Sequence, residues 1–172
     1  MPEIADAAVA PDGRTLVTVH PQDSIARWWS AEKGMPPKLL AHEGPVLSVA
    51  FSPDGGYFTT NSGDTRQRLW SARGELLATY QNIGTVDLLH TAAFSPDSRQ
   101  LLVLEDDQTA KLYPVQSEDK TVEMKEPNGT IVDAAFLPGS DGLMLLCAGP
   151  DGVVNRVRIF DRQGRKRFDG SL

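Results

Sequence analysis

The fold of this chain is decided by residues 39–80, which read LLAHEGPVLSVAFSPDGGYFTTNSGDTRQRLWSARGELLATY. Short apolar and β-branched runs alternate there with turn sequences such as SPDG and SGDT. Runs of this kind predict strands with alternating faces, and Pro, Asp and Gly are residues that turns prefer. We therefore predict four short antiparallel strands here, the second of them the apolar and β-rich run YFTTNS; its counterpart in the last part of the chain is GLMLLCA. We find no stretch with helical periodicity.

The same pattern occurs four times in the 172 residues. The last residue of each first strand recurs at spacings of 42, 43 and 42 residues, at Val9, Phe51, Phe94 and Phe136. The third strand of each unit ends on an aromatic residue, at Trp29, Trp70, Tyr113 and Phe160. A fixed period of this length predicts a stack of similar sheets. We expect a single array over residues 1–172, with blades of approximately 3–44, 45–86, 87–129 and 130–172.

From Ile4 to about Phe168 the repeat resembles the WD-repeat family, whose units have four strands in about 40–45 residues. The resemblance implies an all-β fold, a β-propeller of WD-repeat type with four four-stranded antiparallel blades. The sequence departs from the family pattern, because no unit carries the literal Trp-Asp pair and only the second unit has both the histidine and the tryptophan. The corresponding pairs are Trp29-Ser30, Trp70-Ser71, Tyr113-Pro114 and Phe160-Asp161.

The resemblance also implies a buried hydrogen-bond chain of a histidine, a turn aspartate, a strand hydroxyl and the tryptophan indole. The matching residues in the second unit are His42, Asp64, Thr60 or Ser62, and Trp70, and Asp107 is the turn aspartate of the third. Such an aspartate would hold the histidine tautomer and tie the loop to the sheet. The same residue types could form a Ser-His-Asp catalytic set, but the repetition of the aspartate favours a structural role.

Four blades are few for a closed ring of this family, and a half-ring would expose large apolar faces at both ends. Two arrangements are equally favoured: two copies joined as halves of an eight-bladed ring, or a partial ring with further blades in a longer chain. Closure of four blades on their own is less favoured. Light scattering distinguishes the paired ring from an 18.7 kDa monomer.

In the family, partners often dock at the start of the first strand and just before the turn aspartate. The corresponding candidates here are Pro45, Leu47, Leu88, His90, Thr130, Val132, Gln22 and Asp106. Leu47, Leu88 and His90 together would give the mixed apolar and polar character of a binding centre. The alternative for each position is an ordinary residue at the end of a loop.

The composition argues against several classes of partner. With 17 basic and 23 acidic residues the formal charge is −6, and nucleic-acid binding needs basic surface. The basic cluster falls on the last turn and edge strand, where charges guard against unwanted pairing; it consists of Arg162, Arg165, Lys166 and Arg167. No apolar run approaches the roughly 20 residues of a membrane span. Without a secretory signal, the chain is expected in the cytoplasm.

No motif for a metal or a cofactor is found, and we expect none. The three histidines, His20, His42 and His90, are far apart in the repeat. The acidic run at 105–107 lacks the alternating ligands of a calcium loop. Cys147 lies in the apolar run LMLLCAG and is expected to be a buried, inert thiol.

The sequence thus predicts a non-catalytic scaffold or recognition module that binds a protein or peptide. The alternative is a regulatory or sensor propeller segment of a larger multidomain enzyme such as a kinase. A reading frame that continues into a catalytic domain would favour this alternative.

Overall fold

The computed structural model describes residues 4, 6–20, 22–32, 34–81, 94–116, 119–140 and 142–171. Within these ranges the chain forms antiparallel strands, and its one helical element is the short 3₁₀ turn η2 (Pro138–Ser140). The prediction of an all-β chain is confirmed. No helix in the described part has the length and apolar character needed to cross a membrane. The chain divides into two compact units, Met1–Gln81 and Asn82–Leu172.

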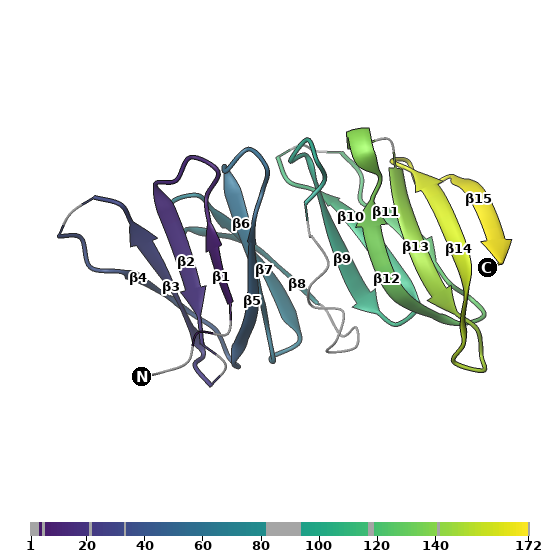
Figure 1. Ribbon diagram of the computed structural model, residues 1–172, viewed down its shortest axis with the longest axis horizontal. Coiled ribbons are helices and arrows are strands. Elements are labelled where there is room, and N and C mark those ends of the chain that lie inside the picture. Colours follow the sequence, from purple (N-terminus) through teal and green to yellow (C-terminus); the bar gives the residue numbers. More distant parts are fainter. Residues whose placement is uncertain are drawn as a thin grey trace. The chain divides into compact units, whose positions relative to one another are not determined.

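The first unit contains two four-stranded sheets, here called blades 1 and 2 (Figure 1). Blade 1 consists of β1 (Asp6–Val9), β2 (Thr15–Val19), β3 (Ile25–Ser30) and β4 (Lys38–Ala41). Blade 2 consists of β5 (Val46–Phe51), β6 (Tyr57–Ser62), β7 (Arg66–Ser71) and β8 (Leu76–Gln81). In both sheets each strand pairs with the next one along the chain.

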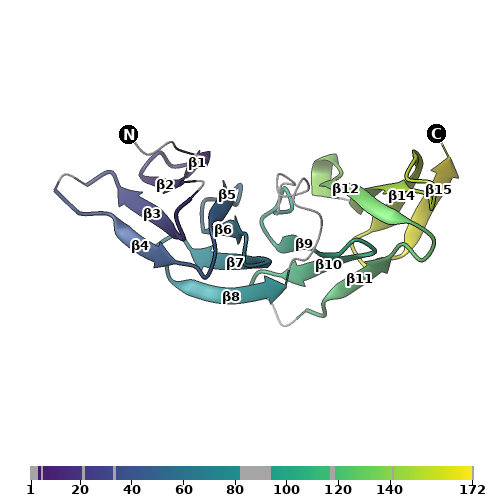
Figure 2. The ribbon, with the colours of Figure 1, turned by 90° about the horizontal axis from the view of Figure 1, so that it is seen from below.

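The second unit contains the sheets here called blades 3 and 4. Blade 3 consists of β9 (Gln100–Asp106), β10 (Thr109–Pro114) and β11 (Val122–Lys125). Phe94 pairs with Leu101 of β9 at the place where the first strand of this blade was predicted. Blade 4 consists of β12 (Thr130–Phe136), β13 (Gly142–Ala148), β14 (Val154–Asp161) and β15 (Lys166–Ser171). Figure 2 gives a second view of these strands.

The strand predictions agree closely with the structure because the turns that bound them are local. The predicted second strands YFTTNS and GLMLLCA coincide with β6 and β13. Ser52 and Ser95, in the two SPD turns, each donate a hydroxyl hydrogen bond to an aspartate two residues later, at 2.6 and 2.7 Å. The same short motif therefore fixes the same turn in both units.

Each unit has an apolar core between its two sheets. In the first unit, β2, β3 and β4 contribute Val17, Val19, Ala26 and Leu40, and blade 2 contributes Val46, Val49, Phe58 and Trp70. In the second unit the core side chains of blade 3 are Leu102, Leu104, Ala110, Leu112 and Met124. Those of blade 4 are Ile131, Ala134, Leu143, Leu145, Cys147 and Phe160. Face-to-face burial of alternate side chains is what holds each pair of sheets together.

Candidate functional site

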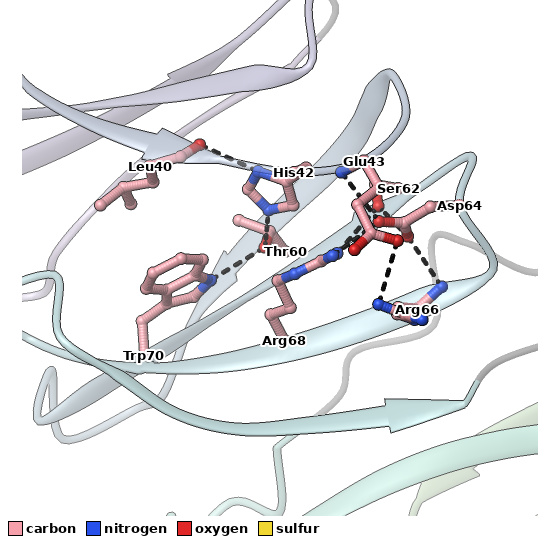
Figure 3. Close-up of polar contacts among 9 residues, drawn as sticks. All are labelled: Leu40, His42, Glu43, Thr60, Ser62, Asp64, Arg66, Arg68 and Trp70. Carbon is pink, nitrogen blue, oxygen red and sulfur yellow. Dashed lines mark hydrogen bonds and ion pairs between the residues drawn. The ribbon is translucent and has the colours of Figure 1, made fainter.

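A buried hydrogen-bond chain joins the end of blade 1 to blade 2 (Figure 3). His42 directly follows β4, and its Nε2 atom lies 2.7 Å from Thr60 Oγ1 on β6. The Trp70 indole Nε1–H on β7 donates to the same hydroxyl oxygen at 2.9 Å. The Thr60 side chain is completely buried, so this one hydroxyl serves two polar groups that water does not reach.

The partners of His42 determine its tautomer. Its Nδ1 atom lies 2.9 Å from the Leu40 carbonyl oxygen, which can only accept a hydrogen bond. Nδ1 therefore carries the hydrogen, and Nε2 accepts from the Thr60 hydroxyl. Burial lowers the pKa of His42, and the nearby Arg68 guanidinium lowers it further. The imidazole is thus neutral at pH 7.

The prediction that Asp64 holds the tautomer of His42 is wrong. The Leu40 carbonyl already occupies Nδ1, and the Asp64 carboxylate instead binds the Ser62 hydroxyl, the Glu43 backbone N–H at 3.2 Å and Arg68 at 2.6 Å. Burial by itself would raise the pKa of Asp64, but the hydrogen bonds from Arg68 and Ser62 outweigh it, and the pKa lies well below its usual value. Asp64 therefore fixes the turn before β7 and ties the loop after His42 to that turn.

The corresponding joint of the second unit uses Glu126, which the sequence analysis did not single out. Glu126 directly follows β11 as His42 follows β4, and its backbone N–H donates to the Gln108 carbonyl as that of His42 donates to Ser24. Its side chain is buried and lies 2.8 Å from Arg158 Nη1 and 3.6 Å from Arg156 Nη1. An ion pair thus replaces the hydrogen-bond chain at this joint.

The other positions of this second joint changed together with it. Strand pairing places Leu145 at the position of Thr60, and Phe160 at that of Trp70. The phenylalanine side chain has no N–H group, so it needs no hydroxyl partner. Cys147 takes the position of Ser62; burial and the neighbouring Glu126 raise the pKa of its thiol to about 12.

Two β-bulges carry predicted binding residues. The pairing of β5 with β6 shifts between Val46 and Ser48, so that Leu47 is the extra residue. The pairing of β12 with β13 shifts between Ile131 and Asp133, so that Val132 is the extra residue. Both side chains are half-buried. A bulge interrupts the alternation of a strand and changes the direction of a side chain, and bulges are common beside functional sites.

Backbone hydrogen bonds bring the other predicted residues to these bulges. The Val46 N–H donates to the Asp23 carbonyl at 3.0 Å, which places the turn with the exposed Gln22 beside the exposed Pro45. The Ile131 N–H donates to the Asp107 carbonyl at 2.6 Å, which places the exposed Asp106 beside Thr130. Each unit thus carries one cluster, Gln22–Pro45–Leu47 or Asp106–Thr130–Val132. Leu88 and His90 lie outside the described residues.

The comparisons with known proteins agree with this geometry. The family "WD domain, G-beta repeat" matches residues 36–71, which contain β4, the His42 joint and β5 to β7. Residues 36–71 therefore match one WD repeat. Over 97 residues it is 33% identical to the "Periodic tryptophan protein 2 homolog" of Neurospora crassa, covering 56% of this chain and 11% of that one.

A second relative matches over more of the chain. The "Eukaryotic translation initiation factor 3 subunit I" of Candida albicans is 24% identical over 160 residues, covering 84% of this chain and 45% of the relative. The chain therefore spans less than half the length of both relatives. Kuenenia stuttgartiensis hydrazine synthase shares the fold with a TM-score of 0.69 at 14% identity, over 100% of this chain and 50% of the other.

Blade 3 differs from the prediction at its turn aspartate. Asp107 was expected to act through its carboxylate, but its side chain is exposed and its backbone carbonyl accepts the Ile131 N–H. The carboxylate of Asp106 accepts the Gln108 N–H at 2.8 Å, as that of Asp64 accepts the Arg66 N–H at 3.0 Å. The sequence has two adjacent aspartates at this turn, and in the structure the carboxylate of Asp106, not that of Asp107, binds the turn backbone.

The polar groups of the first joint are arranged for packing and not for nucleophilic catalysis. A Ser-His-Asp set requires the histidine to contact both a nucleophile and the carboxylate. Here both nitrogens of His42 have other partners, and Ser62 binds Asp64 directly. Within the described residues no group of three or more His, Cys, Asp or Glu side chains could hold a metal ion.

Proposed function

We propose that this WD-repeat chain binds a protein or peptide partner through its two bulge clusters and catalyses no reaction itself. The observation that carries the proposal is the repetition of the bulge. Leu47 and Val132 occur at the same strand position in different units, each beside the start of a blade and a preceding turn. Packing inside a sheet does not require an extra residue there, whereas presentation of a side chain does.

The composition of the clusters is suited to a peptide ligand. Each combines a half-buried apolar side chain with an exposed polar one, Gln22 in the first unit and Asp106 in the second. A partly buried apolar side chain surrounded by polar groups is the usual character of an interface centre and its rim. The relative named as a translation initiation factor subunit is, by its name, a component of a larger assembly, which supports a protein as partner.

Selection of peptides from a displayed random library on the purified chain tests this function. We expect the selected peptides to bind Leu47→Ala or Val132→Ala about five- to thirtyfold more weakly than the parent chain, because truncating a central apolar residue costs roughly 1–2 kcal/mol. The matched control is Leu77→Ala, because Leu77 is an exposed leucine on edge strand β8.

Thermal unfolding of each variant separates lost binding from lost folding. Equal peptide affinities for the parent chain, both bulge variants and the control would show that the bulges are not the binding site.

A further inference from the structure

Each unit contains one joint in which two sheets pack face to face. We call the side of a sheet that faces the next blade along the chain its outgoing face, and the opposite side its incoming face. The outgoing face of blade 1 consists of Val17, Val19, Ala26, Trp28 and Leu40. It packs on the incoming face of blade 2, formed by Val49, Phe51, Phe58 and Trp70. Trp28 Nε1–H also donates to the Ala72 carbonyl of blade 2 at 3.0 Å.

The joint of the second unit uses the same strand positions. Leu112 pairs with Leu102 as Trp28 pairs with Val17, so the outgoing face of blade 3 matches that of blade 1. Its members are Leu102, Leu104, Ala110, Leu112 and Met124, and they pack on Ala134, Phe136, Leu143, Leu145 and Phe160 of blade 4. The chain therefore contains two copies of one packing design.

The incoming face of blade 1 repeats the design without a cover. Strand pairing matches Val9, Leu16 and Trp29 to Phe51, Phe58 and Trp70 of blade 2. The Trp29 indole donates to Thr18 Oγ1 at 3.1 Å, as Trp70 donates to Thr60. The exposed fraction is 62% for Val9 and 37% for Trp29, against 5% for the buried Trp70. The polar contact of a joint is present on this face, and no sheet among the described residues covers it.

The outgoing face of blade 4 is the complementary half. Because Leu143, Leu145 and Phe160 face blade 3, the alternate side chains of β13 and β14 point the other way. These are Met144, Leu146, Val157 and Ile159, and strand pairing matches them to Val17, Val19, Ala26 and Trp28 of blade 1. Phe168 on β15 pairs with Ile159, lies close against Gly170 and is 52% exposed.

The turn glycines give independent evidence that the face of blade 1 is uncovered. A side chain built at Gly55 of blade 2 would meet Pro11 of blade 1 at 3.2 Å, and one at Gly74 would meet Lys38 and Leu40 of blade 1 at 3.4 Å. Gly13 is the counterpart of Gly55 in blade 1. A side chain built there would have no described neighbour within 4 Å.

We propose that the outgoing face of blade 4 in one copy of this chain packs on the incoming face of blade 1 in a second copy. The chain itself carries both halves of the joint, in the register that its two internal joints use, so a second copy supplies the matching surface. Arg27, at the edge of the incoming face, is already paired with Asp23 at 2.7 Å, so packing leaves no isolated cation. The contact is heterologous, because the two copies use different surfaces.

Sedimentation velocity of the 172-residue chain between about 1 and 100 μM tests the proposal, in the range where modest interfaces associate. We expect association into species of at least twice 18.7 kDa. Val9→Asp and Phe168→Asp should each abolish self-association, because every copy of a variant lacks the same one of the two faces that the contact needs. Both side chains are more than half exposed in the single chain, so folding should tolerate the changes. Val153→Asp, at an exposed turn residue, is the control and should associate like the parent chain.

A mixture of the two variants distinguishes this contact from any symmetric one. Val9→Asp keeps the outgoing face and Phe168→Asp keeps the incoming face. The equimolar mixture should therefore form a heterodimer, while each variant alone should be monomeric. A monomeric parent chain over the whole range overturns the proposal, as does association that neither variant affects or a mixture that remains monomeric.

Discussion

Replacing Thr60 by valine removes one hydroxyl and preserves the shape of the side chain. That hydroxyl accepts the Trp70 indole N–H at 2.9 Å and contacts His42 Nε2 at 2.7 Å, and the Thr60 side chain is completely buried. The change removes two hydrogen bonds, each worth about 1 kcal/mol net, and leaves two buried groups without partners. We expect the free energy of unfolding of the first unit to fall by about 2–4 kcal/mol. Urea denaturation followed by circular dichroism measures this difference.

Two further variants make the test specific. Thr18→Val removes the equivalent hydroxyl in blade 1, but Trp29 is partly exposed and can bond to water, so the loss should stay below about 1 kcal/mol. Adding Trp70→Phe to Thr60→Val removes one unpaired group, so the double variant should lose about 1–2 kcal/mol less than the sum of the single changes. A Thr60→Val chain as stable as the parent, or strictly additive effects, would refute the hydrogen-bond chain.

Three further predictions follow from the buried groups. Arg158→Leu should lower the stability of the second unit by about 3–5 kcal/mol in urea, because Glu126 would lose its nearest counter-charge, and Glu126→Gln in the same chain should restore part of the loss. Burial lowers the pKa of His42 in the folded state, so below its ordinary value of 6.5 the unfolded chain binds the proton first. Stability should therefore fall as the pH drops from 7 toward 5, and His42→Gln should reduce this slope; an unchanged slope would contradict the assignment. Cys147, with its pKa raised to about 12, should resist iodoacetamide at pH 8 in the folded chain and react in urea, as mass spectrometry can measure.

Much of the architecture could be predicted because the signals that set it are local. The Pro- and Gly-containing turns and the apolar, β-rich runs predicted β6 and β13 to the residue, since each strand ends where its turn residues begin. The partner of His42 could not be predicted in the same way. It is the backbone carbonyl of Leu40. Every residue has a backbone carbonyl, so the order of side-chain types does not indicate which one binds the histidine.

Glu126 shows a second limit. Seven residues separate β10 from β11, as seven separate β3 from β4, and Glu126 lies 13 residues after Tyr113 as His42 lies 13 residues after Trp29. The family pattern has a histidine at this position, so a search for that residue type passed over the glutamate, although each residue directly follows the last strand of its blade. Leu47 and Val132 were chosen as candidates by matching the chain to the family's repeat. That each is the extra residue of a β-bulge is seen only from the strand pairing.

The central claim is that one neutral histidine, His42, holds the joint between blades 1 and 2 through two hydrogen bonds. Two-bond nitrogen–proton correlation NMR on the ¹⁵N-labelled chain at pH 7 reads the protonation of the His42 ring directly. The structure predicts a hydrogen on Nδ1 and a bare Nε2, with Leu40 and Thr60 as the respective partners. A hydrogen on Nε2, or a doubly protonated ring, would contradict it.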